Sequence, residues 1–160
     1  MSEIAKQIKA IVDLGLAPLL KQAGFRKRTN YARVGGESLQ LINVQSSQWN
    51  MGLQGRFTLN TGVHFSGVAK MLMGADPMPA IPKHFYCLIR KIVGQLLLDK
   101  ADRWWIVTPL TNIPDAAAEL SSAINDCVLP WLTKVETISG VATELERGPD
   151  PFNGWSITTY

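Results

Sequence analysis

The chain has 160 residues, of which 46% are hydrophobic, and its formal net charge is +3. These values are typical of one soluble globular domain, and no apolar run approaches the roughly 20 residues that cross a membrane. Two cysteines are too few for a disulfide framework, and the N-terminal segment lacks a signal-peptide pattern, so we expect a cytoplasmic protein.

The charges are distributed unevenly along the chain. Residues 1–100 contain 13 lysines and arginines but five acidic residues, whereas residues 101–160 contain three and eight. A basic first part could attract an acidic partner or phosphates. Scattered charges usually face solvent, however, and only Arg26, Lys27 and Arg28 cluster locally.

The first 65 residues predict a helix followed by a meander of antiparallel strands. Residues 2–23 show helical spacing of apolar side chains, and Gly15 and Pro18 predict a kink or a break. Gly35-Gly36 suits a hairpin, and residues 48–54 form a longer loop. The expected strands are 26–34, 38–47 and 55–65.

The middle of the chain is less regular. Ser66 is a candidate cap for a short helix that Gly74 would end, and the three prolines within residues 76–82 predict a loop. Residues 84–98 fit a helical pattern slightly better than alternation, but Gly94 weakens a helix there. Residues 103–108 are rich in strand formers.

The clearest predicted helix covers residues 114–133, with Pro130 expected to kink its end. A further short helix is expected over residues 137–147, and GPDPFNGW, residues 148–155, is expected to be a loop. We expect residues 1–160 to form a single domain, with a core at about 1–134 and a C-terminal extension at 135–160.

The most informative pattern is a row of polar side chains on two neighbouring strands. Because side chains alternate along a strand, Asn60 and His64 share one face, and Asn43, Gln45 and Ser47 share another. If the strands pair, these groups could bind a ligand or a partner surface. Alternatively, they face water or satisfy nearby backbone groups.

Adjacent tryptophans also suggest a surface feature. Trp104 and Trp105 point to opposite faces of the predicted strand. One of them should therefore fill the core, while the other lies under a helix or on a binding surface.

No recognisable catalytic or metal-binding motif is present in the sequence. His84 and Cys87 share a face only on a helix, and zinc-ligand spacing is absent. A hydrolase could be hidden in a pair such as His64 with Asp102, but phosphate-loop and dinucleotide motifs are missing. We therefore predict no catalytic residues, no metal and no cofactor. The modest net charge and the lack of a known motif argue against nucleic acid.

Four segments in this order resemble a known family. LKQAGFRKR, LINVQSSQWN, FTLNTGVHF and LIRKIVG followed by DRWW are similar to a bacterial family known as domain of unknown function 4304, over about residues 4–133. The resemblance implies that residues 85–94 form a strand before the Trp-Trp strand. It implies no catalytic residues, because the family has no agreed activity.

The sequence predicts an α+β fold, in which a mainly antiparallel sheet of about five strands is packed on one face by the N- and C-terminal helices. We expect a non-catalytic protein-binding domain, and its concrete form would be a bacterial immunity protein that neutralises a toxin. The alternatives are a ligand- or nucleic-acid-binding module on a polar, basic sheet face, which would also use Arg28, and an uncharacterised hydrolase. The candidate binding residues are Asn43, Gln45, Ser47, Arg56, Asn60, His64, Arg90 and Trp104.

Overall fold

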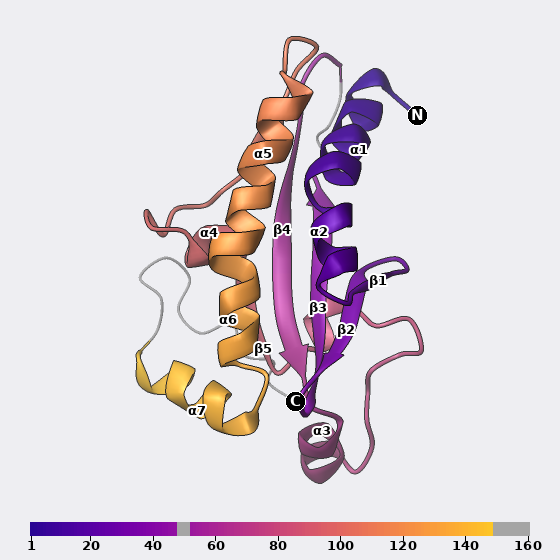
Figure 1. Cartoon of the computed structure of the whole chain (residues 1–160). Coiled ribbons are helices and arrows are strands. Elements are labelled where there is room, and N and C mark those ends of the chain that lie inside the picture. Colours follow the sequence, from indigo (N-terminus) through magenta and orange to yellow (C-terminus); the bar gives the residue numbers. More distant parts are fainter. Residues whose placement is uncertain (48–51, 149–160) are drawn as a thin grey trace.

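A computed structural model describes residues 1–47 and 52–148 of the chain. It contains a six-stranded antiparallel sheet, with helices from both ends of the chain packed on one of its faces (Figure 1). This arrangement confirms the predicted α+β fold. Residues 48–51 and 149–160 lie outside the described residues, and with them most of the loop predicted at 148–155.

The sheet is built around one long central strand, β4. In chain order the strands are β1 (Arg26–Lys27), β2 (Tyr31–Gly35), β3 (Ser38–Ser46), β4 (Gly55–His64), β5 (Ile89–Ile92) and β6 (Trp105–Val107). Their order in the sheet is β1-β2-β3-β4-β5, and β6 also pairs with β4. Because β3 occupies one edge of β4, β5 and β6 divide the other edge between them.

The prediction of a single strand at residues 26–34 is wrong, because the chain forms a small hairpin there. Arg26 pairs with Ala32 and Lys27 with Tyr31, so β1 and β2 run antiparallel. The turn between them is closed by the Arg28 backbone N–H, which donates to the Asn30 carbonyl. Asparagine favours turns, so Asn30 was the residue in the sequence that indicated a turn within this segment.

The predicted N-terminal helix is divided into α1 (Glu3–Gly15) and α2 (Ala17–Gln22), as Gly15 and Pro18 indicated. Gly15 also has a packing role, because α1 crosses helix α5 (Ile113–Ala123) there. A Cβ at Gly15 would lie 2.4 Å from the Ala117 carbonyl oxygen. The Ser121 hydroxyl donates to the Gly15 carbonyl at 2.8 Å, so the two helices are also hydrogen-bonded.

The segment between β4 and β6 contains short elements. Helix α3 (Ser66–Met73) ends at Gly74, whose φ is +79°, but Phe65 takes the cap position expected for Ser66. The ambiguous residues 84–98 contain a 3₁₀ turn, η1 (His84–Tyr86), then strand β5 and the one-turn helix α4 (Val93–Leu96). The strand that the family resemblance implied is therefore present, although it is shorter than predicted.

The helix predicted at residues 114–133 is continuous but not uniform. After α5 come a π-helical segment, η2 (Ile124–Val128), and helix α6 (Leu129–Lys134). Within η2 the Leu129 N–H donates to the Ile124 carbonyl. Pro130 has no N–H for an α-helical bond, and the wider π turn immediately before it accommodates this loss. Helix α7 (Ile138–Glu146) follows.

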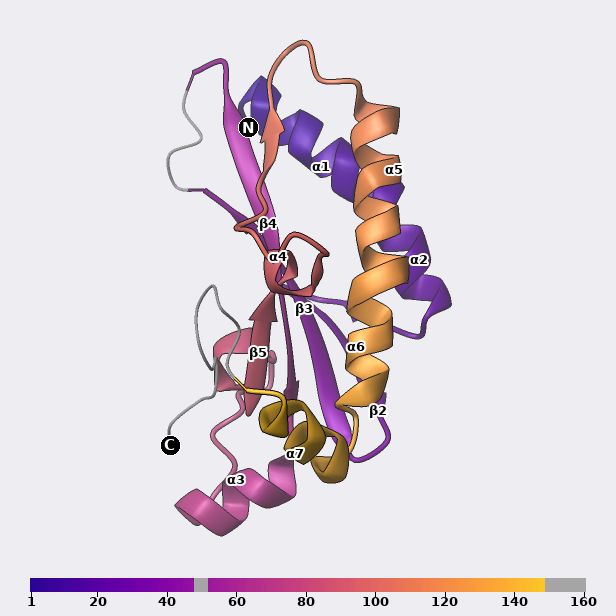
Figure 2. The ribbon, with the colours of Figure 1, turned by 90° about the vertical axis from the view of Figure 1, so that its left-hand side faces the viewer.

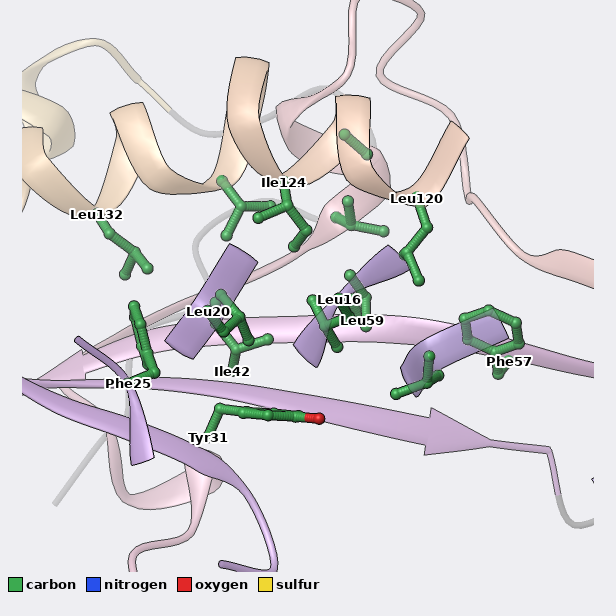
Figure 3. Close-up of a cluster of buried hydrophobic side chains, with 14 of the residues drawn as sticks. Leu16, Leu20, Phe25, Tyr31, Ile42, Phe57, Leu59, Leu120, Ile124 and Leu132 are labelled. Carbon is green, nitrogen blue, oxygen red and sulfur yellow. The ribbon is translucent and has the colours of Figure 1, made fainter. Parts of the chain in front are cut away.

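One hydrophobic core fills the space between the sheet and the long helices (Figure 3). Ile42, Phe57 and Leu59 enter it from the sheet, and Leu20 and Ile124 from the helices. Val141 of α7 belongs to the same cluster. Within the part of the chain that the structure describes, no helix is long and apolar enough to span a membrane.

Candidate functional site on the back face of the sheet

One face of the sheet lies opposite the long helices, and we call it the back face (Figure 2). The strand register places the candidate residues on this face. The register pairs Asn43 with Asn60 and Arg90 with Gly62, and residues paired across strands point to the same side. Their neighbours Ile42 and Leu59 fill the helix-covered core, so these polar side chains point the other way. By alternation the same face receives Gln45, Ser47, Arg56, His64 and Trp104.

The centre of the back face carries a relay of side-chain amides. The Asn60 amide group donates to Gln45 Oε1 at 2.7 Å and to Asn43 Oδ1 at 3.1 Å. Asn43 donates to Asn30 Oδ1 at 2.8 Å, and Asn30 donates to the Pro82 carbonyl at 2.8 Å. The amides therefore form a directional chain of donors that runs from β4 to the proline-rich loop.

This relay is mainly a structural device. Asn60 is only 7% exposed and Asn30 only 6%, and their hydrogen bonds are made within the protein. Buried amides need such partners, because an unpaired buried polar group costs free energy. Of the central residues only Gln45 is exposed, so the polar row offers a partner less surface than its sequence pattern suggested.

His64 is held at the other end of β4 by two oxygen atoms. Its Nε2 lies 2.9 Å from Asp76 Oδ1, and its Nδ1 lies 3.3 Å from the Tyr86 carbonyl. The pairing of His64 with Asp102 that the sequence left open is wrong, because Asp102 instead accepts a hydrogen bond from the Trp104 indole. The imidazole is 3% exposed, so this pair fastens the loop after α3 to the sheet.

The Asp76 carboxyl group has a strongly perturbed pKa. Burial raises this pKa, but hydrogen bonds from Ser66, the Met78 backbone and His64, together with the nearby imidazole, outweigh burial and lower the pKa to about 2. The Met78 N–H donates to Asp76 at 2.9 Å, which closes a turn within the Asp-Pro segment. Asp76 is therefore held as a carboxylate.

Arg90 lies on β5 beside the relay. Its buried Nε has no hydrogen-bond partner among the residues described. The pKa of His84 is lowered by burial and by the charge of Arg90, while burial raises the pKa of the Cys87 thiol. This part of the back face therefore carries a guanidinium with unused hydrogen-bonding capacity.

An aromatic–cation pair lies at the β6 end of the back face. The Arg56 guanidinium lies 4.7 Å from the centre of the Trp104 ring, and the neighbouring Ile106 is 59% exposed. Trp105 faces the core and stacks on Phe57, with ring centres 5.4 Å apart. The two tryptophans thus point to opposite faces, as predicted. We name Arg56, Trp104 and Ile106 the β6 patch.

The eight candidate residues therefore share a face but not a single site. Asn43, Gln45 and Asn60 are joined by hydrogen bonds, whereas His64 lies beyond them in the Asp76 pair. Ser47, at 9% exposure, is buried near Arg56, to whose carbonyl its N–H donates. Neither cysteine forms a disulfide bond among the described residues, which also contain no group of three or more potential metal-ligating acidic, histidine or cysteine side chains.

Sequence reasoning missed two residues that organise this face, Asn30 and Asp76. Asn30 was assigned to the interior of a strand, and Asp76 to a surface loop. The signals were available, because Asn in a strand-like run and Asp before proline both favour turns. Their long-range partners, 52 residues away for Asn30 and 12 for Asp76, follow only from the fold.

Comparison with known proteins gives a family without an assigned activity. Residues 16–134 match the family described as domain of unknown function (DUF4304). The chain belongs to this family. The match confirms the resemblance seen in the sequence and covers the sheet together with α5 and α6, whereas all of α1 and all of α7 lie outside it. No curated protein and no solved structure match this DUF4304 chain.

Proposed function

We propose that the protein is a non-catalytic binding domain that recognises a protein partner with the β6 patch. The observation that carries this proposal is the Arg56 guanidinium stacked 4.7 Å from the Trp104 ring centre, beside the 59% exposed Ile106. Tryptophan and arginine are enriched among residues that dominate binding energy, particularly where they surround an apolar contact. The sheet beneath holds these side chains in place.

The charge of the back face indicates what such a partner presents. Arg56 and Arg90 are both directed to this face by the strand register. A carboxylate suits a guanidinium because it accepts two parallel hydrogen bonds. The partner surface we propose is therefore an apolar protrusion flanked by acidic side chains.

The concrete form of the proposal is a toxin-neutralising immunity protein, whose partner is a toxic enzyme blocked by this domain. The test is to co-express the chain with the product of the gene next to it, and to measure growth and co-purification. We expect the wild type to restore growth. Trp104→Ala and Ile106→Glu should weaken the complex at least about tenfold, because each removes a central apolar contact.

Ile138→Glu is the matched control, because Ile138 is 50% exposed at the start of α7, away from the back face. It should leave the complex unchanged. A complex that tolerates both back-face variants contradicts the assignment of the β6 patch. A monomer that hydrolyses a small substrate without any partner contradicts the proposal as a whole.

The alternative of a ligand- or nucleic-acid-binding module relied on Arg28, Arg56 and Arg90 acting together. Arg28 follows the edge strand β1, whereas Arg90 lies on β5 at the opposite edge of the sheet. Such widely separated cations favour a long anionic polymer over one compact ligand. Binding to that polymer would weaken steeply with salt, whereas a partly apolar protein interface would be much less sensitive.

A further inference from the structure

A second feature of the back face lies at its other edge, away from the β6 patch. A cavity of about 480 Å³ opens between the strands β1 to β3 and the loop residues Ala80 to Pro82. This volume is in the range of small-molecule sites. Of the residues that the structure describes, Arg26, Arg28 and Arg33 line it, and no acidic side chain does.

The neighbouring cations of this segment are divided between two faces. Lys27 points to the helix-covered side, where it lies 3.9 Å from Asp13 and over the Tyr31 ring. Arg33 donates to Gln40 and to the Ala23 carbonyl, and its cation lies over Phe25. These two cations are thus used within the protein.

Arg26 and Arg28 are different, because both are exposed and neither side chain has an ion pair or hydrogen bond to the residues described. They are two residues apart, with Arg26 in β1 and Arg28 directly after it, so alternation turns both toward the cavity. Two like charges beside a cavity to which no described acidic side chain contributes repel each other, and an anion between them would relieve this repulsion.

Apart from the three arginines and Asn30, the described lining of the cavity is apolar. Val34 is 81% exposed and Ile81 47% exposed, and Leu39 contributes from β3. Asn30 also lines the cavity, but its amide is used in the relay and donates to the Pro82 carbonyl. Asn30 therefore positions the wall of the cavity and is not free to contact a ligand.

We propose that this cavity binds a small phosphate monoester that carries an apolar group. The phosphate would lie between Arg26 and Arg28, because guanidinium groups bind phosphate oxygens through paired charge-assisted hydrogen bonds. The apolar group would lie against Val34, Leu39 and Ile81. A dianion suits two guanidinium groups better than a monoanionic carboxylate does.

Phenyl phosphate is the probe, and binding is measured by calorimetry and by amide chemical-shift changes in the full chain. At low salt we expect saturable binding with a Kd at or below about 1 mM. Inorganic phosphate should bind more weakly because it lacks the ring, and benzoate because it carries one charge. Shifts should map to β1, β2 and residues 80–82.

Variants separate a defined site from general charge attraction. Arg28→Gln and Arg26→Gln should each weaken phenyl phosphate binding about tenfold, the loss expected for one charge-assisted contact. Lys27→Gln is the matched control, because it removes the same charge from the other face, and it should change the Kd less than about twofold. Ile81→Asn should weaken phenyl phosphate but not inorganic phosphate.

Three outcomes overturn the inference. The first is the absence of saturation by phenyl phosphate up to about 10 mM, well above the expected Kd. The second is an equal loss in Lys27→Gln, and the third is benzoate binding as tight as that of phenyl phosphate. Thermal melting of each variant verifies folding. The partner assay of the β6 patch is independent, so either proposal can fail alone.

Discussion

At the scale of single residues, polar side chains determine how the back face is built. Asn60, Asn43 and Asn30 relay hydrogen bonds to a loop carbonyl, and His64 and Asp76 make a second tie to the same loop. Periodicity placed Asn43, Gln45, Asn60 and His64 on one side of two strands. It could not show that these groups bond to each other, because side-chain pairing depends on register and on distant loops.

The relay predicts a stability difference between two of its amides. Asn60→Ala removes two hydrogen bonds and leaves Asn43 and Gln45 without their donor. The free energy of unfolding should therefore fall by about 1–3 kcal/mol. Gln45→Ala is the control, because Gln45 is exposed. This substitution should lower the free energy of unfolding by less than about 1 kcal/mol. Urea unfolding measures both. Equal losses for the two variants would contradict the relay.

The Asp76 carboxylate predicts a pH dependence. Its pKa is lowered from 3.8 to about 2 in the folded protein, so the unfolded chain binds this proton more tightly. The stabilisation is therefore complete above about pH 4 and is lost as the pH falls toward 2. After solvent screening we expect roughly 1–2 kcal/mol.

Asp76→Asn should remove this part of the acid dependence of the unfolding free energy, measured by urea unfolding at several pH values. Asp99→Asn, at an exposed carboxylate, should retain the wild-type slope between about pH 4 and 2. If the Asp76 variant loses stability with acid as steeply as the wild type, the carboxylate does not have the role assigned to it.

At the scale of elements, sequence patterns located most helices and strands but not their details. Gly15 was a candidate helix breaker, and the structure shows that it also permits α1 to approach α5 at Ala117. Pro130 predicted a kink, and the chain instead inserts the π segment η2. A glycine or proline in the sequence predicts that a helix is interrupted near it. Whether the interruption is a break, a kink or a π turn depends on the elements that pack against the helix.

The crossing of α1 and α5 predicts opposite effects for two glycine substitutions. Gly15→Ala places a Cβ 2.4 Å from the Ala117 carbonyl oxygen, so it should destabilise the fold by about 1–3 kcal/mol. Gly67→Ala is the control in the exposed part of α3, where a Cβ meets nothing within 4 Å. It should stabilise by about 0.5–1 kcal/mol, the helix propensity of alanine over glycine. Thermal and urea unfolding distinguish the two signs.

At the scale of the whole molecule, α7 is joined to the core although it lies beyond the family match. Val141 enters the common hydrophobic cluster. Glu144 accepts from the Trp131 indole at 3.1 Å and lies 3.3 Å from the Lys91 amine, in a pair about one-tenth exposed. The extension is thus fastened to both β5 and α6.

This fastening predicts that Glu144 contributes to global stability. Glu144→Leu leaves the Trp131 N–H without its acceptor and removes the carboxylate facing Lys91, which should cost about 2 kcal/mol. Glu146→Gln, at an exposed position of the same helix, should be nearly neutral. A neutral Glu144 variant, measured by urea unfolding, would indicate that α7 unfolds separately from the core.

The sequence by itself determined the fold class, the family, and which residues of a strand share a face, because these depend on local periodicity and on ordered motifs. Only the tertiary structure decided that the central amides are used internally, that Asp76 pairs with His64, and that Arg26 and Arg28 line a cavity. The physical reason is that side-chain partners and cavities are made by segments far apart in the chain. Alternation fixes the direction of a side chain but not what it meets.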